Sequence, residues 1–308
     1  MVACSPFGPA GEFAAARHGA LTRRQAAIEG LTPIIINRLL RDRVLEEPVP
    51  GVLVVVGAPP TWRQRLYVAT LASRGAGAVG FRSAAALHGL DGYSEGPIEL
   101  LVPSHRRIRL PDLVVHRGPY EQQLDITEVD GIACTSVART LCDIATVDSS
   151  LDLKVAFEAA WRAGHSLEWF RQTATRLHLP GRTGPRRLLA PVDAAQQRGT
   201  PTESALEVKV EQVLDALPGV VRQHRVHRAD GSFVARVDFA IPELRIAIEA
   251  HSRQHHFGHE AVEDDAVRES ELQAEGWIVR FVTERQRRRP DELRRSLARL
   301  VAARSRPT

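Results

Sequence analysis

The chain has 308 residues, of which 44% are hydrophobic and 25% are charged. These values are ordinary for a folded protein. They exclude a disordered or collagen-like chain, and the length predicts two or three domains. The net charge of +4, from 41 basic and 37 acidic residues, is too small to indicate nucleic-acid binding by itself. Only Lys154 and Lys209 are lysines, so arginine, the better bidentate phosphate ligand, carries almost all of the positive charge.

The cysteines and the apolar runs indicate a compartment. Cys4, Cys134 and Cys142 form no C-x-x-C pair, which predicts reduced thiols. No apolar run approaches the roughly 18 residues of a membrane span, and the N-terminus lacks the pattern of a secretory signal. We therefore expect a cytoplasmic protein with no membrane partner.

The first 60 residues predict two helices followed by a hairpin. Thr22 and Thr32 are suited to cap helices over residues 23–29 and from residue 33 to about residue 44. The apolar face of the second helix would consist of Ile35, Leu39 and Leu40. Residues 45–49 and 52–56 read as the two strands of a hairpin, since Pro-Gly separates them.

Helix, turn, helix and hairpin is the order of a winged helix-turn-helix over residues 1–60. The second helix would then read DNA, and its candidate contacts are Asn37, Arg38 and Arg41. The alternative is a helical hairpin that only packs against its neighbour.

Residues 61–195 predict an α+β middle domain. The pattern indicates helices over residues 62–72, 83–88, 137–145, 151–163 and 167–176, and strands over residues 98–102, 113–116 and from about residue 126. Turn residues over 180–187 and 196–201 bracket a predicted linker region.

Residues 202–308 predict a third domain with an α/β order. The expected elements are a helix over 203–217, strands over 220–227, 233–241 and 245–250, a helix over 260–275, a strand over 277–283 and a helix over 290–303. This order contains one crossover connection. The whole chain is therefore predicted to be of the α/β class in the broad sense, as a multi-domain α+β protein.

Two carboxylates of this third domain form the main candidate site. Asp238 lies near the end of one predicted strand and Glu249 near the end of the next, so a tight turn between the strands brings them together. Two such carboxylates suit Mg²⁺ or Mn²⁺, and Glu207 on the preceding helix is a candidate third ligand. The alternative has each acid solvated or paired with Arg236 or Arg245.

Histidines follow the second carboxylate. His251, His255, His256 and His259 lie within nine residues. His251 and His256 are candidates for proton transfer or phosphate contact beside the carboxylates. Zinc bound by histidine and carboxylate alone is an alternative. Residues 285–306 hold nine arginines and two acids, a stripe that suits a phosphate backbone or a solubilising helix.

The C-terminal third resembles the very-short-patch-repair-like (Vsr-like) endonuclease domain of the PD-(D/E)xK superfamily. The matching pieces, in order, are Ser204-Ala-Leu-Glu207, Arg236-Val-Asp-Phe-Ala240, Ile248-Glu-Ala-His-Ser252, His255-His256, Asp265-x-x-Arg268, Leu272-x-x-x-Gly-Trp277 and Arg280-Phe-Val-Thr283. The resemblance implies a mixed sheet with flanking helices and metal-dependent hydrolysis of phosphodiesters. By position it implies Asp238, Glu249 and Glu207 as metal ligands, with His251 and His256 in the active site.

One departure bears on activity. The Glu-x-Lys of the superfamily is here Glu249-Ala250-His251, and neither lysine of the chain lies at the motif. His251 is able to replace the lysine because histidine titrates near neutrality. Alternatively, the domain keeps the fold and has lost the activity.

The first two-thirds resemble the AbiEi (type IV) antitoxin family. The matching pieces are Gly19-Ala-Leu-Thr-Arg-Arg-Gln25 through Gly51-Val-Leu-Val54, Ser83-Ala-Ala-Ala-Leu-His-Gly89 and Thr135-Ser-Val-Ala-Arg-Thr-Leu-Cys-Asp143. This resemblance implies operator DNA binding beside a nucleotidyltransferase toxin. We therefore expect a DNA-binding protein with an endonuclease-like domain, and the alternatives are a non-enzymatic regulator or antitoxin and a zinc-dependent structural module.

Overall fold

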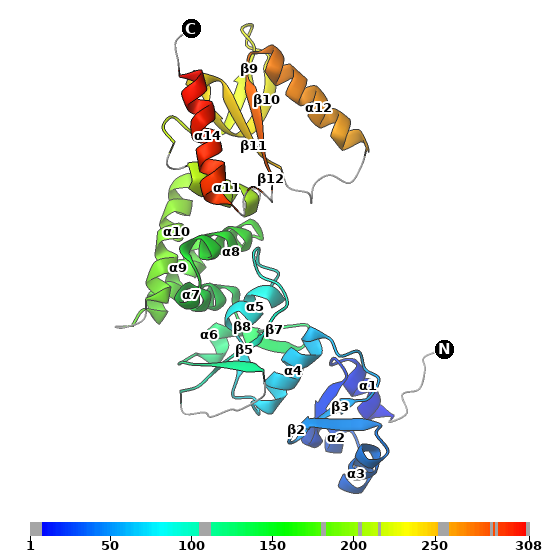
Figure 1. Cartoon of the computed structure of the whole chain (residues 1–308). Helices are drawn as coiled ribbons and strands as arrows, with labels where there is room; N and C mark the ends of the chain where they lie inside the picture. The colour runs from blue at the N-terminus through cyan, green and yellow to red at the C-terminus, as the bar shows by residue number, and fades with distance from the viewer. Residues whose placement is uncertain are drawn as a thin grey trace. The chain divides into compact units, whose positions relative to one another are not determined.

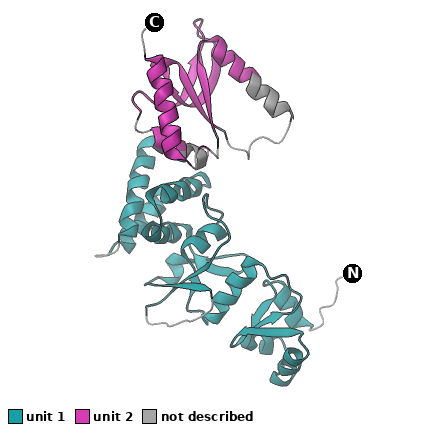
Figure 2. Cartoon of the chain, viewed as in Figure 1, with its two compact units in different colours: residues 1–200 teal, residues 201–308 magenta. Residues whose placement is uncertain are grey.

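The computed structural model describes residues 8–104, 112–179, 183–202, 205–214, 217–251, 259–283, 286 and 289–305. For some of these, including Glu207 and His251, it describes the backbone alone. The chain divides into two compact units, residues 1–200 and residues 201–308 (Figure 2). Helices and three separate sheets occur along the described chain, which confirms the predicted multi-domain α+β fold.

The N-terminal part of the first unit has the element order of a winged helix. Its elements are α1 (Pro9–Ala15), β1 (Ala20–Thr22), α2 (Arg23–Ile28), α3 (Pro33–Arg41), β2 (Leu45–Val49) and β3 (Val52–Val55). The sheet order is β1-β3-β2 with antiparallel pairing throughout. The helices, their caps Thr22 and Thr32, and the hairpin are confirmed, because each threonine hydroxyl accepts a backbone N–H three residues on.

Two details of this part differ from the sequence-based expectation. Helix α1 and strand β1 were not predicted, since both are short and β1 acquires its form by pairing with β3. On α3 the buried residue is Ile36 at 2% exposure, whereas Ile35 is only half-buried.

The rest of the first unit consists of a five-stranded sheet and a helical cluster (Figure 1). Its elements are α4 (Trp62–Ala72), β4 (Ala78–Val79), α5 (Phe81–Leu87), β5 (Ile98–Val102), β6 (Leu113–Arg117), α6 (Gln122–Asp125), β7 (Ile126–Val129), β8 (Ile132–Thr135), α7 (Val137–Val147), α8 (Ser150–Arg162), α9 (Leu167–Leu177) and α10 (Gly184–Arg198). The sheet order is β6-β5-β4-β8-β7.

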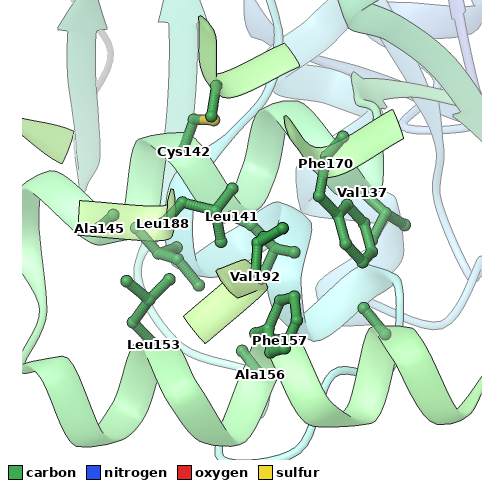
Figure 3. Close-up of a cluster of buried hydrophobic side chains, with 14 of the residues drawn as sticks. Val137, Leu141, Cys142, Ala145, Leu153, Ala156, Phe157, Phe170, Leu188 and Val192 are labelled. Atoms are coloured by element: carbon green, nitrogen blue, oxygen red, sulfur yellow. The ribbon is translucent and has the colours of Figure 1, made fainter. Parts of the chain in front are cut away.

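Helix α10 replaces the predicted linker, which was wrong over residues 184–198. Leu188, Val192 and Ala195 recur along one face of α10 and are completely buried. Figure 3 shows Leu188 and Val192 of α10 among the buried side chains contributed by α7 and α8. A Cβ atom on Gly184 would lie 2.2 Å from the Thr146 side chain, so this glycine allows α10 to start directly against α7. The sequence suggested a loop because residues 180–187 hold turn residues and little apolar content. Pro185 in fact lies in the first turn of α10, and Pro191 lies inside the helix.

A buried ionic network joins α6, α7 and α9. Asp125 and Arg139 are 0% and 2% exposed, and the Arg139 guanidinium donates to Asp125 at 3.2 Å and to Asp143 at 3.0 Å. Arg176 from α9 also pairs with Asp125. Burial raises the pKa of Asp143 to about 6. Loss of one partner from this network would leave an unpaired charge in the interior, which is strongly destabilising.

The second unit has one mixed sheet with the predicted order of elements. Its elements are α11 (Ala205–Leu214), β9 (Val221–His227), β10 (Phe233–Ile241), the 3-10 turn η1 (Pro242–Leu244), β11 (Ile246–His251), α12 (His259–Ala274), β12 (Ile278–Thr283) and α14 (Pro290–Arg304). The sheet order is β12-β11-β10-β9. Strands β11 and β12 are parallel and α12 connects them, which confirms the predicted crossover.

Helices α12 and α14 cover opposite faces of this sheet (Figure 1). On the α14 face, Leu293 and Leu297 pack with Phe239, Ile248 and other apolar side chains. On the α12 face, Leu272 packs with Val237, Ala247 and their neighbours. Within the described residues, no helix is long and apolar enough to cross a membrane.

Candidate functional site

The sheet of the second unit opens between its two central strands. Strand β10 pairs with β11 only from Phe239↔Ile248 to Ile241↔Ile246, although β10 pairs with β9 from Phe233 onward. Strand β11 meanwhile stays paired with β12 as far as His251↔Thr283. Asp238 and Glu249 are therefore the first residues beyond the last pair, at the point where the two strands separate.

The side chain of Asp238 replaces the missing backbone pairing. Its Oδ2 atom accepts the backbone N–H of Ala250 at 2.9 Å, and its Oδ1 atom accepts Nε2 of Gln223 at 3.4 Å. Val237 and Phe239, on either side of Asp238, pack into core clusters on different faces of the sheet. The alternation of β10 is thus interrupted at Asp238, which is typical of irregular strands that re-aim a functional side chain.

Gln223 of β9 lies beside Asp238 and is unusual in two respects. Its φ of 46° falls in the left-handed region that non-glycine residues rarely adopt. Its Oε1 atom is buried and has no hydrogen-bond partner among the described residues. A buried oxygen without a partner points to a water molecule or a cation as its natural ligand.

Glu249 is a buried carboxylate whose proton is held unusually tightly. The residue is 7% exposed. Burial, followed by the negative charge of Asp238, raises the pKa of Glu249 to about 7. The guanidinium of Arg268, from α12, forms an ion pair with Glu249 and opposes this rise. A cation is stabilised where two carboxylates lie close enough to repel each other.

The donor set fits a hard divalent cation. Asp238, Glu249 and the buried Oε1 of Gln223 present carboxylate and amide oxygens, the ligands that Mg²⁺ and Mn²⁺ prefer. Arg268 now supplies the positive charge beside Glu249, so a cation there has to displace Arg268 or share Glu249 with it. Across the described residues, no three His, Cys, Asp or Glu side chains gather in a metal-binding group.

The other predicted site residues are only partly described. Glu207 lies in α11, which packs against β11, and His251 is the last residue of β11, but their side chains are not described. His256 lies outside the described residues, as does His255, so the zinc alternative is not tested there.

Gln223 and Arg268 were not predicted as site residues. Arg268 did occur in a matching piece, Asp265-x-x-Arg268, and its spacing within the crossover helix was the available signal. No sequence pattern pointed to Gln223 as a site residue, because only the pairing of β9 with β10 brings it next to Asp238. Of the predicted alternative partners, Arg245 lies outside the strand and donates to the backbone oxygen of Glu275 at 2.9 Å.

The predicted DNA-reading residues share the exposed side of α3. Asn37, Arg38 and Arg41 are all exposed, together with Ile34 at 81%. The Asn37 side-chain oxygen accepts a hydrogen bond from Arg23 at 3.4 Å. The helix therefore presents two arginines and one amide to the solvent, a set able to contact phosphates and base edges.

Arg23 ties the start of α2 to the hairpin. Its guanidinium donates to both oxygens of Glu47, at 2.8 and 2.5 Å, and Glu47 also accepts the backbone N–H of Gly51 at 2.7 Å. The hydrogen bonds from Arg23 lower the pKa of Glu47 to about 2. This contact holds the hairpin at a set position relative to α2.

These features define a chain of the α+β class with a winged-helix order at its start and a paired-carboxylate site in an opened sheet at its end. The chain is 30% identical over 222 residues to two Mycobacterium tuberculosis proteins, uncharacterized protein MT2308 (strain CDC 1551 / Oshkosh) and uncharacterized protein Rv2248 (strain ATCC 25618 / H37Rv). Each match covers 70% of this chain and 78% of the relative. The chain therefore belongs to the same family as these two proteins.

No family model matches the chain. Among solved structures, the RV2827C protein from Mycobacterium tuberculosis matches with a TM-score of 0.43 and 19% identity, over 73% of this chain and 93% of that one.

Proposed function

We propose that the protein binds DNA and that its C-terminal unit hydrolyses phosphodiester bonds with Mg²⁺ or Mn²⁺. The observation that carries the proposal is the juxtaposition, where the sheet opens, of Asp238, Glu249 and a buried oxygen of Gln223 that has no hydrogen-bond partner among the described residues. The resemblance of the same residues to the Vsr-like endonuclease domain supports it.

In this proposal each residue has a definite task. The Ala250 N–H holds Asp238 in orientation, and Asp238, Glu249 and Gln223 together hold the cation, with Glu207 as a further ligand. When bound, Mg²⁺ supplies a Lewis acid that stabilises negative charge on a phosphate. His251, at the position of the superfamily lysine, accepts the proton of the attacking water, since an imidazole titrates near neutrality. For His256, which lies outside the described residues, the resemblance implies contact with the phosphate.

A nicking assay on supercoiled plasmid tests this activity. Wild-type protein with Mg²⁺ is expected to convert the plasmid to the open circular form, and Asp238→Ala and Glu249→Ala are expected to abolish that conversion without unfolding the chain. Glu243→Gln is the matched control, since Glu243 is an exposed acid of η1 between the same two strands. If wild type cuts no DNA and the variants behave like it, the catalytic proposal is wrong.

A second candidate is a non-enzymatic regulator or antitoxin that keeps an inactive nuclease fold. The ion pair between Arg268 and Glu249 favours it, because an internal cation already neutralises the buried carboxylate. In that case the exposed face of α3 binds an operator, and a nucleotidyltransferase toxin is the partner. A footprint upstream of the chain's own gene, lost in Arg38→Ala or Arg41→Ala but kept in the exposed control Arg65→Ala, supports this candidate.

A further inference from the structure

A hollow of about 390 Å³ lies between β12 and α14, lined mainly by polar side chains. Its lining residues are Arg280, Gln286, Glu292, Leu293, Arg295, Ser296 and Arg299. Four of them, Glu292, Arg295, Ser296 and Arg299, follow one flank of α14 at the spacing of a helical face. Arg280 approaches from the sheet, and its guanidinium donates to Ser296 at 3.4 Å.

The charge of this hollow is strongly positive. Three guanidinium groups line it, and within the described part of the chain none of them has a carboxylate partner. The single acid of the lining, Glu292, accepts hydrogen bonds from Arg289 at 3.1 and 3.4 Å. Glu292 is thus engaged by a fourth arginine, and the described residues supply no carboxylate partner to the other three.

The hollow is separate from the carboxylate site, although both belong to the second unit. Arg280 is in register with Ile248, whose side chain lies on the α14 face. Glu249 is the next residue along β11 and pairs with Arg268 on the α12 face. Because side chains alternate along a strand, the two sites lie on opposite faces of the sheet.

We propose that this hollow binds a phosphate group through Arg280, Arg295 and Arg299. Arginine presents a planar fork of donors that matches phosphate oxygens, and three such forks around one concave surface are suited to an oxyanion. Ser296 adds a hydroxyl donor. The phosphate belongs either to a nucleic-acid backbone or to a free phosphate compound. The site requires neither a metal nor catalytic activity.

The experiment measures ligand binding by the full-length chain in EDTA, which removes divalent cations. The chain carries Arg38→Ala and Arg41→Ala, so that α3 contributes little to the binding of nucleic acid. One arm titrates a labelled ten-residue oligothymidylate at several salt concentrations, and the other titrates inorganic phosphate by calorimetry. The test variants are Arg295→Gln and Arg299→Gln, singly and together. The matched control is Arg294→Gln, which removes a charge from the opposite flank of α14, where Arg294 pairs with Asp291.

For a backbone phosphate, the double variant is expected to bind the oligonucleotide at least about tenfold more weakly, since hydrogen bonds to charged groups are strong. Its log–log salt slope should fall by about 1.4, or about 0.7 for each lost contact. For a free phosphate, the same variants lose phosphate binding and leave oligonucleotide binding unchanged. Either result supports the site. Equal effects of Arg294→Gln, or no change in either arm while thermal unfolding stays normal, would overturn it.

Discussion

The Oδ2 atom of Asp238 accepts the backbone N–H of Ala250 at 2.9 Å, across the opening between β10 and β11. This hydrogen bond satisfies an amide that would otherwise lack a strand partner, and it places the carboxylates of Asp238 and Glu249 near each other. Asp238 is therefore both a structural residue and the source of the charge that raises the pKa of Glu249.

Replacing Asp238 with alanine is expected to destabilise the second unit by about 1–3 kcal/mol, because a partly buried amide loses its charged acceptor. The same change is expected to lower the pKa of Glu249, since a repelling charge disappears. Chemical denaturation measures the first effect and a carbon-13 NMR titration of the Glu249 carboxyl measures the second. An unchanged Glu249 pKa would show that burial alone sets it.

The stability of the second unit should fall as the pH rises. Glu249 has a raised pKa of about 7 in the folded chain, so the folded state holds a proton that the unfolded state releases above its ordinary pKa of 4.5. The contribution is present below pH 4.5 and is lost as the pH rises through 7, on the order of 3 kcal/mol. Unfolding measured from pH 4.5 to pH 8 in wild type and Glu249→Gln checks this. The variant should be less sensitive to pH over that interval, and parallel curves would contradict the assignment.

Removing the internal counter-ion should strengthen cation binding. In Arg268→Gln the carboxylate of Glu249 loses its ion pair, so a divalent cation no longer competes with a guanidinium. We expect Mn²⁺ to bind about fivefold more tightly, since a partly exposed ion pair contributes on the order of 1 kcal/mol. Calorimetric titration with Mn²⁺ measures this, with Arg245→Gln in the same unit as the control. Weaker Mn²⁺ binding in Arg268→Gln would mean that Arg268 supports the site rather than competes for it.

The ionic network of the first unit should be essential for its stability. Asp125→Ala leaves Arg139 buried without one of its carboxylates and also removes the partner of Arg176. The expected loss is about 3–5 kcal/mol, since a charge stranded in the interior is costly. Thermal unfolding measures it, and Glu128→Ala on the neighbouring strand β7 is an exposed control. Similar losses in both variants would show that the network contributes little.

Much of the fold could be predicted from local patterns. The hairpin of β2 and β3 and the Thr22 and Thr32 caps depend on residues close in the sequence. The crossover between β11 and β12 was predicted from the order of the elements along the chain, although its paired residues are distant in the sequence. Helix α10 could not be predicted, because its turn residues suggest a loop and only packing against α7, α8 and α9 compensates for them. Strand β1 likewise exists because β3 provides a partner.

For the candidate site, the amino-acid sequence by itself determined the two acids, since Asp238 and Glu249 follow strand patterns of recognisable length and spacing. The tertiary structure decided what surrounds them. Gln223 is 15 residues from Asp238 in the chain, and Arg268 is 19 residues from Glu249. Such partners meet only through strand register and the docking of α12, which depend on burial of the whole sheet and not on any local motif. The charge beside the carboxylates, and with it the pKa of Glu249, is thus a property of the folded unit.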